Sequence, residues 1–307
     1  MPISNQLIQS NLTAIKSILH QTSTFFTLFF CALTIFTSCK KGQQVTPSSA
    51  VLKVSGADYV WGDLSIDRTT GSDVIKYNAN GNIDSVVSYD ANGHRTGSII
   101  LTYSGNKITL NTMYDDTYEL DAVGRVISHS SQQIQNGYNF ISTENFTYDA
   151  NGYLNKVTMA ENANLSGVSS GTTIYSVINY EVQNGNYIKF ALSNTTGGTV
   201  TRQYNFTYNS SVKINGSYAL FAPIFSNNTA SNIDKYLNYG KISVNLLTGV
   251  NYTIVNLDNS VSTGLFNVVT KLNDDNYLTQ LSLTGNDPAG FSSDNISPLP
   301  RSIKFSY

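Results

Sequence analysis

Cysteine is nearly absent from this sequence: the 307 residues include only Cys31 and Cys39. Cys31 lies inside a hydrophobic run near the N-terminus, and no cysteine follows Cys39. The rest of the chain can therefore form no disulfide, and we expect no thiol catalysis, cysteine-ligated zinc or iron–sulfur cluster. A chain of this length buries enough apolar surface to fold without such cross-links.

Charge is also scarce, because only 12% of the residues are Asp, Glu, Lys or Arg and the formal net charge is −2. No basic run or stripe is present, so nucleic acid is not an expected partner. The polar surface comes instead from Asn, Ser and Thr, and the chain holds 20 tyrosines and 22 glycines. Tyrosine and threonine favour strands, and glycine and asparagine favour turns, so the composition indicates an all-β protein.

Histidine offers little for catalysis, since the chain has only His20, His94 and His129. His20 lies near the N-terminus, His94 follows a turn glycine, and His129 lies in a strand-like run. We expect the last two to face solvent. Two histidines do not assemble a convincing metal site, and no G-x-S-x-G motif supports a Ser-His-Asp triad. No cofactor or metal is therefore expected.

Two pairs of adjacent acidic residues are the remaining candidates for catalysis. Asp115-Asp116 and Asp274-Asp275 suggest glycoside hydrolysis, in which two carboxyl groups flank the scissile bond. Adjacent residues of a strand, however, point to opposite faces, and acidic residues in turns are usually solvated. A carboxylate-based glycan-acting enzyme is thus the alternative hypothesis, and a binding protein is the main one.

The single tryptophan, Trp61, stands in the run Tyr59-Val60-Trp61-Gly62. Tryptophan and tyrosine side chains form platforms on which sugar rings stack, so Trp61 is a candidate ligand-binding residue. The alternative is ordinary packing within a sheet, which is where most aromatic residues of strands are used.

The first 38 residues have the features of a targeting segment. They contain one basic residue, Lys16, and end in the apolar run Phe25–Phe36, which has the length of a signal-peptide core and is too short to span a bilayer. The next residues, Phe36–Cys39, resemble the lipobox of bacterial lipoproteins, in which the cysteine is lipidated and becomes the new N-terminus. The alternative is an ordinary secretory signal cut nearby. Residues 40–50 then form a polar, flexible tether.

The phrase YDANG occurs twice, at Tyr89–Gly93 and Tyr148–Gly152, and YNANG begins at Tyr77. Asp or Asn suits the first turn position, and Gly supplies the positive φ that closes a type I turn with a bulge. Alternating residues flank the first turn: Ile83, Ser85 and Val87 are predicted to share one face and Val86 the other. Each phrase is therefore interpreted as the corner of a β-hairpin, and a calcium loop is not favoured.

One region interrupts this meander. Ser231–Leu237 has a possible N-cap, an early acid and apolar residues four apart, so the sequence predicts one short helical insertion ending near Gly240. Strand patterns then resume to the end of the chain. We predict a single curved antiparallel β domain over residues 51–307, as either an open sheet or a closed barrel.

The lipobox, the tether and the successive Y-x-x-x-G hairpins together resemble a group of uncharacterised bacterial outer-membrane lipoproteins with YD-type repeats. Tyr236–Leu246, YLNYGKISVNL, is also similar to a segment of those proteins. The resemblance implies an all-β domain held at the outer membrane by acyl chains, such as palmitate, on Cys39. We expect a binding or scaffolding role with a glycan or an envelope protein as partner. No acid follows Cys39 within residues 40–44, which favours the periplasmic face.

Overall fold

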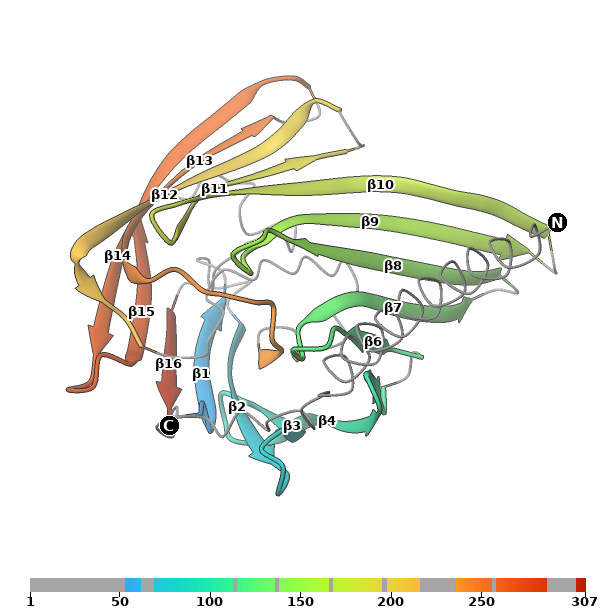
Figure 1. Ribbon diagram of the computed structural model, residues 1–307, viewed down its shortest axis with the longest axis horizontal. Coiled ribbons are helices and arrows are strands. Elements are labelled where there is room, and N and C mark those ends of the chain that lie inside the picture. The colour runs from blue at the N-terminus through green and yellow to red at the C-terminus, as the bar shows by residue number, and fades with distance from the viewer. Residues whose placement is uncertain are drawn as a thin grey trace, which may run out of the picture. The chain divides into compact units, whose positions relative to one another are not determined.

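The structure, a computed structural model, describes residues 53–61, 69–112, 115–135, 138–165, 168–194, 198–215, 233, 236–255, 258–285 and 302–307. These form sixteen strands (Figure 1). Their bounds are β1 Gly56–Trp61, β2 Thr69–Tyr77, β3 Ile83–Asp90, β4 Arg95–Ser104, β5 Lys107–Leu110, β6 Thr117–Leu120, β7 Val126–Gln135, β8 Tyr138–Tyr148, β9 Leu154–Leu165, β10 Val168–Gln183, β11 Asn186–Ser193, β12 Val200–Lys213, β13 Asn245–Val255, β14 Val261–Leu272, β15 Leu278–Gly285 and β16 Ser302–Ser306. The expected signal segment, Cys39 and the tether lie outside the described residues.

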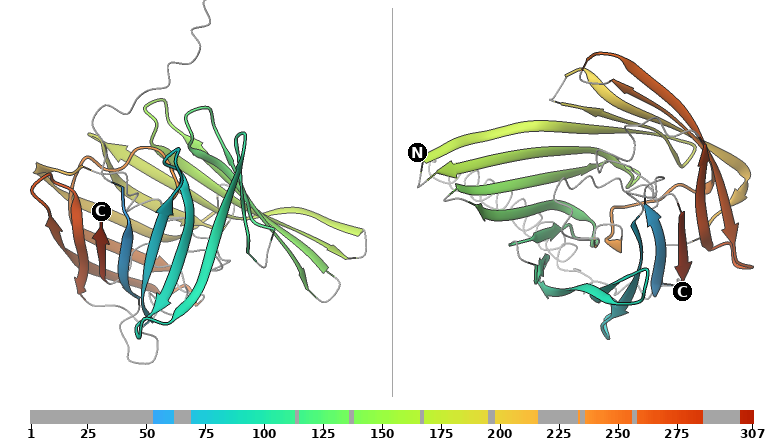
Figure 2. Two further views of the ribbon diagram at one scale, coloured as in Figure 1. Left: turned by 90° about the horizontal axis from the view of Figure 1, so that it is seen from below. Right: turned by 180° about the vertical axis from the view of Figure 1, so that it is seen from behind.

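The strands form one closed antiparallel barrel in sequence order. Each strand pairs with the next along the chain, so the colours change in order around the ring, and β16 lies beside β1 (Figures 1 and 2). The ring closes because Gly56 pairs with Ser306 and Val60 with Ser302. The predicted all-β antiparallel meander is thus confirmed, and of the two predicted forms the sheet takes the closed one.

One turn geometry recurs at five corners of the barrel. A side-chain oxygen of the first turn residue accepts hydrogen bonds from the backbone N–H groups two and four residues later. The first residues are Asn78, Asp90, Asp121, Asp149 and Asn273. The fourth position has a positive φ in each, near 80° at Gly93 and 60° at Asn276. The hairpin corners predicted from YDANG are confirmed.

The predicted face assignment within β3 is wrong at one point. Strict alternation separates Ile83 from Val86, but both side chains are buried, at 7% and 0% exposure. The pairing register between β2 and β3 shifts between Lys76 and Tyr77, which leaves Asp84 as an extra, exposed residue. A bulge of this kind adds one unpaired residue to the strand, which reverses the alternation beyond it. The side chain of Ile83 therefore points to the inside of the barrel.

The interior of the barrel is packed with apolar side chains contributed by every strand. Aromatic rings run through it in contact, from Tyr180 to Phe190, Tyr204, Tyr252 and Phe266. Ring pairs at such separations add to the stabilisation from buried area alone. The inside of this barrel is therefore a core.

Residues 236–244 are here named the bridging segment. They follow β12 and precede β13 in the chain, and they run inside the ring of strands (orange in Figure 1). Leu237 and Tyr239 of the segment are buried in the core, as is the preceding Ile233. Of the predicted helix Ser231–Leu237, the described residues show one turn bond, from the N–H of Tyr236 to the carbonyl of Ile233 at 2.8 Å. Positions 231, 232, 234 and 235 of that prediction lie outside the described residues.

The outward positions of the strands carry mostly small polar and charged side chains. Exposed residues on the barrel wall include Thr102, Thr109, Glu119, Asn145, Thr147, Asn179, Thr207, Asn251, Thr263, Asn267 and Lys304. The apolar exceptions include Val261, Leu265 and Val269, which share the outward face of β14 and are 61%, 50% and 52% exposed. In the part of the chain that is described, no helix is long and apolar enough to cross a membrane.

Candidate functional site: a pocket at one end of the barrel

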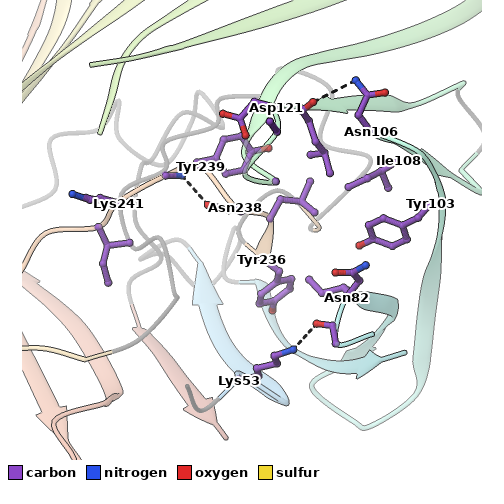
Figure 3. Close-up of a pocket in the computed structure, with 18 of the residues that line it drawn as sticks. Lys53, Asn82, Tyr103, Asn106, Ile108, Asp121, Tyr236, Asn238, Tyr239 and Lys241 are labelled. Carbon is purple, nitrogen blue, oxygen red and sulfur yellow. Dashed lines mark hydrogen bonds between the residues drawn. The ribbon is translucent and has the colours of Figure 1, made fainter. Parts of the chain in front are cut away.

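A pocket of about 980 Å³ opens at the end of the barrel where the β2–β3, β4–β5 and β6–β7 turns lie. One side is formed by these turns and the strand ends behind them, and the other by the bridging segment (Figure 3). Its apolar lining includes Ile83, Ile108, Leu120 and Leu237. Tyrosines line much of the remainder: Tyr77, Tyr103, Tyr153, Tyr236 and Tyr239.

The bridging segment is fixed in place by hydrogen bonds to three parts of the barrel. The hydroxyl of Tyr236 donates to the buried carboxylate of Asp73 at 2.7 Å, and Ser88 donates to the same carboxylate. The backbone N–H of Val126 donates to the carbonyl of Asn238, and the N–H of Lys241 donates to that of Gly152. Because both ends of the segment are tied, this wall of the pocket is preorganised.

Lys53 at the lower rim already has partners within the protein. Its Nζ donates to the carbonyl of Gly81 at 2.5 Å and lies 5.0 Å from the centre of the Tyr77 ring. The hydroxyl of Tyr77 in turn donates to the carbonyl of Val54 at 2.8 Å. Lys53 therefore closes the rim, and its ammonium keeps its charge and further donor capacity.

Asp121, the carboxylate in the pocket lining, is engaged in the same way. One oxygen accepts from the backbone of Val123 and Arg125, and the other accepts from Arg125 Nε at 2.7 Å. Burial acts to raise the pKa of this carboxyl, but the hydrogen bonds from Arg125 outweigh it and hold the pKa below its ordinary value. Asp121 is thus an ionised turn residue whose oxygens are both occupied.

Three polar groups facing the pocket have spare hydrogen-bonding capacity. Among the described residues, the hydroxyl of Tyr103 and the side-chain amide of Asn82 have no hydrogen-bond partner, and Asn106 uses only its Nδ2, in a long contact of 3.4 Å to Leu120. Burial, assisted by the charge of Asp84, raises the pKa of Tyr103 to about 12. The phenol is therefore neutral at physiological pH and can both donate and accept.

A second polar cluster lies inside the barrel wall, away from this pocket lining. The prediction that His129 faces solvent is wrong: its side chain is 6% exposed, because its position on β7 points inward. Nδ1 lies 3.2 Å from Glu144 Oε2, and Nε2 lies 3.5 Å from Asp116 Oδ1. Thr112 also donates to Asp116, at 2.5 Å. These contacts compensate the charges inside the wall, so the cluster serves the fold.

The other predicted site residues are dispersed. Asp115 is exposed while its neighbour Asp116 is buried, as alternation predicts, and Asp274 and Asp275 are exposed in their turn. His94 is exposed beside Asp90. Among the described residues, no group of three His, Cys, Asp or Glu side chains could hold a metal ion.

The two site residues predicted from the sequence are Trp61 and Cys39. Trp61 ends β1, with its backbone opposite Thr69, but its side chain lies outside the described part of the chain. Cys39 is likewise outside it. Binding at Trp61 and lipidation at Cys39 therefore stay predictions.

Sequence reasoning missed both the pocket tyrosines and the buried cluster. One available signal was Asn136-Gly137, because an Asn-Gly pair closes a two-residue hairpin and thereby fixes the register on either side. Counting back from the observed pair Gln135–Tyr138 places His129 opposite Glu144, as found.

No protein-family model and no curated protein matches the chain. Two solved structures share its fold, both described as porin-like proteins. One, from Bacteroides uniformis, has 15% identity and a TM-score of 0.58, covering 84% of this chain and 98% of its own. The other, from Bacteroides vulgatus, has 14% identity and a TM-score of 0.51, covering 83% of this chain and 98% of its own. At these identities the likeness shows the fold.

Proposed function

We propose that this protein is a lipid-anchored component of the bacterial cell envelope with a binding role, and that its barrel stands in water. Cys39 would carry the lipid, and residues 40–50 would connect it to β1. Lys53, just before β1, lines the pocket, so the chain enters the barrel at its pocket end. The porin-like fold and the lipobox both support an outer-membrane location.

The observation that carries this proposal is the polarity of the barrel wall. A barrel that crosses a membrane needs an apolar band on its outside and is polar within. Here the core is apolar, and Asn, Thr, Lys and Glu occupy the outside, as with Thr109 and Asn251. Burying such outward groups in hydrocarbon costs free energy for each unpaired one. The wall favours contact with water, and membrane attachment then depends on Cys39.

The pocket favours binding over the alternative of a glycan hydrolase. Glycoside hydrolysis generally requires two carboxyl groups on either side of the bond. The residues that line the pocket, all of which are described, include one acid, Asp121, and Arg125 holds it. The scaffolding form of the hypothesis differs in predicting a stoichiometric membrane partner, which purification in mild detergent would reveal.

Cell fractionation tests the proposal. The wild-type chain is expected in the membrane fraction, and Cys39→Ala is expected in the aqueous fraction with its fold intact. Cys31→Ala is the matched control and should stay with the membrane. If a chain with residues 1–39 replaced by an ordinary cleavable secretory signal remained in membranes after an alkaline wash, the barrel itself would be the membrane-binding part and the proposal would be wrong. Protease treatment of intact cells then reports the orientation, with protection expected for the periplasmic face.

A further inference from the structure

We propose that the pocket binds a short neutral saccharide, with the Tyr103 hydroxyl and the Asn82 and Asn106 amides as its recognition groups. This inference rests on the binding role proposed above and names the class of ligand. It depends on three properties of the pocket: the kind of surface, the kind of free polar group, and the size.

The surface is amphipathic in the way that a sugar ring requires. A pyranose has apolar C–H faces and hydroxyl groups around its edge. The lining has apolar side chains such as Ile108 and Leu237, which are mostly covered, and the partly exposed rings of Tyr77, Tyr103 and Tyr236. Figure 3 shows Tyr103 projecting from its strand toward Tyr236 and Asn238 of the bridging segment, so aromatic groups stand on both sides of the space. Tyrosine combines an apolar body with a polar tip and so suits such a ligand.

The free polar groups are uncharged and have both donor and acceptor capacity. Tyr103 contributes a hydroxyl, Asn82 a whole amide, and Asn106 at least its carbonyl oxygen. A sugar hydroxyl is itself both donor and acceptor, so it can satisfy each of these groups. The lining also holds two cations, Lys53, which donates one bond to Gly81, and Lys241, which lies 5.6 Å from the ring centre of Tyr153, so a neutral ligand has to be distinguished from an acidic one by experiment.

The size fits more than one sugar unit. Small-molecule pockets typically measure about 300–1,000 Å³, and the cavity of about 980 Å³ is at the upper end of that range. An extended peptide would instead favour an unpaired sheet edge, such as Val168–Ser176 of β10, which among the described residues pairs with β9 alone and which lies outside the pocket lining. A short oligosaccharide is therefore the ligand that the described residues accommodate best.

Calorimetric titration of the full chain tests this. The protein is purified in a detergent without a sugar head group, because glucoside or maltoside detergents would compete. The probes are short neutral oligosaccharides of glucose, galactose, mannose and N-acetylglucosamine, with oligogalacturonate as the acidic comparison. At least one neutral probe should bind at millimolar concentration or below. Tyr103→Phe and Asn82→Ala should each weaken it about threefold to tenfold, as loss of one hydrogen bond does.

Tyr89→Phe is the matched control, since it removes a tyrosine hydroxyl from β3 outside the pocket lining and should leave binding unchanged. Binding of the acidic probe alone, binding insensitive to both pocket variants, or no saccharide binding at all would each overturn the inference. None of these results bears on the fractionation of Cys39→Ala, so failure of the ligand class is distinguishable from failure of the envelope role.

Discussion

The ring of Tyr118 lies flat against the imidazole of His129, with centroids 4.3 Å apart and 11° between the planes. The two residues are directly opposite each other on β6 and β7, and both point into the barrel. Asp116 and Glu144 flank the same imidazole within 3.5 Å. A buried group of this kind contributes little net stability as a whole, but removing one member leaves its hydrogen-bonding partners, such as Thr112, without a charged acceptor.

Asp116→Asn should therefore lower stability at neutral pH by about 1–3 kcal/mol, because the donors around this buried carboxylate lose a charged acceptor. Burial acts to raise the pKa of Asp116, but hydrogen bonds from His129 and Thr112 outweigh it and hold the pKa below its ordinary value. A depressed carboxyl pKa stabilises the fold above the unfolded-state pKa, and this contribution is lost as pH falls through the folded-state pKa.

Urea unfolding at pH 7, 5, 4 and 3 measures this effect. The stability difference between the wild type and Asp116→Asn should be largest at pH 7 and shrink below about pH 4. Asp115→Asn is the adjacent control and should behave as the wild type throughout, because its side chain is exposed. A difference that stayed constant down to pH 3 would show that the Asp116 charge is not what the cluster uses.

The burial of His129 illustrates what the sequence could not supply. Its neighbours along the chain, Ser128 and Ser130, give no apolar alternation that marks an inward face. Its partners are separated from it by 13 and 15 residues and meet it only across strand pairs. The tight turns between the strands set those pairings, so the register was available from local sequence, but which face is inside depends on closure of the whole ring.

Tyr236→Phe should destabilise the fold by about 1–3 kcal/mol, because it removes a donor from the buried carboxylate of Asp73. Tyr103→Phe is the matched control: its hydroxyl has no partner among the described residues, so its stability should change by less than about 0.5 kcal/mol. Chemical denaturation midpoints measure both. Equal losses in the two variants would indicate that the Tyr236–Asp73 bond does not hold the bridging segment.

The turns, in contrast, were predictable because their hydrogen bonds are local. The first residue bonds to backbone two and four positions away, and the positive φ falls on a fixed position. The position of the bridging segment was not predictable, because Tyr236 bonds to Asp73, which is 163 residues away in the sequence. Its spacing of apolar residues instead suggested a helix: Ile233 and Leu237 are indeed both buried, and the described residues show one local turn bond, from Tyr236 to Ile233.

Gly93→Ala should cost about 1 kcal/mol through backbone conformation alone. Gly93 has a φ of 79°, and no atom lies within 4 Å of the position an added Cβ would take. A steric clash therefore does not contribute to the change in stability. Asn276 occupies the same turn position with a φ of 60°. Asn276→Gly should accordingly fold as the wild type does, within about 0.5 kcal/mol. Thermal unfolding compares the two; a neutral Gly93→Ala would refute the assigned turn geometry.

The polarity of the wall can be tested with two adjacent residues of β14. Phe266 points inward with no exposed surface, and Leu265 points outward with half of its surface exposed. If the barrel stands in water, Leu265→Asn should leave stability within about 0.5 kcal/mol and reduce self-association. Phe266→Ala should lower stability by about 3–5 kcal/mol, because it leaves a cavity beside the ring of Tyr252 in the core.

A barrel whose outside faced lipid would respond differently to Leu265→Asn, since an amide placed in hydrocarbon without a partner is penalised. Loss of membrane-assembled protein with Leu265→Asn would therefore contradict the water-facing wall, and with it the reliance of this protein on Cys39 for attachment.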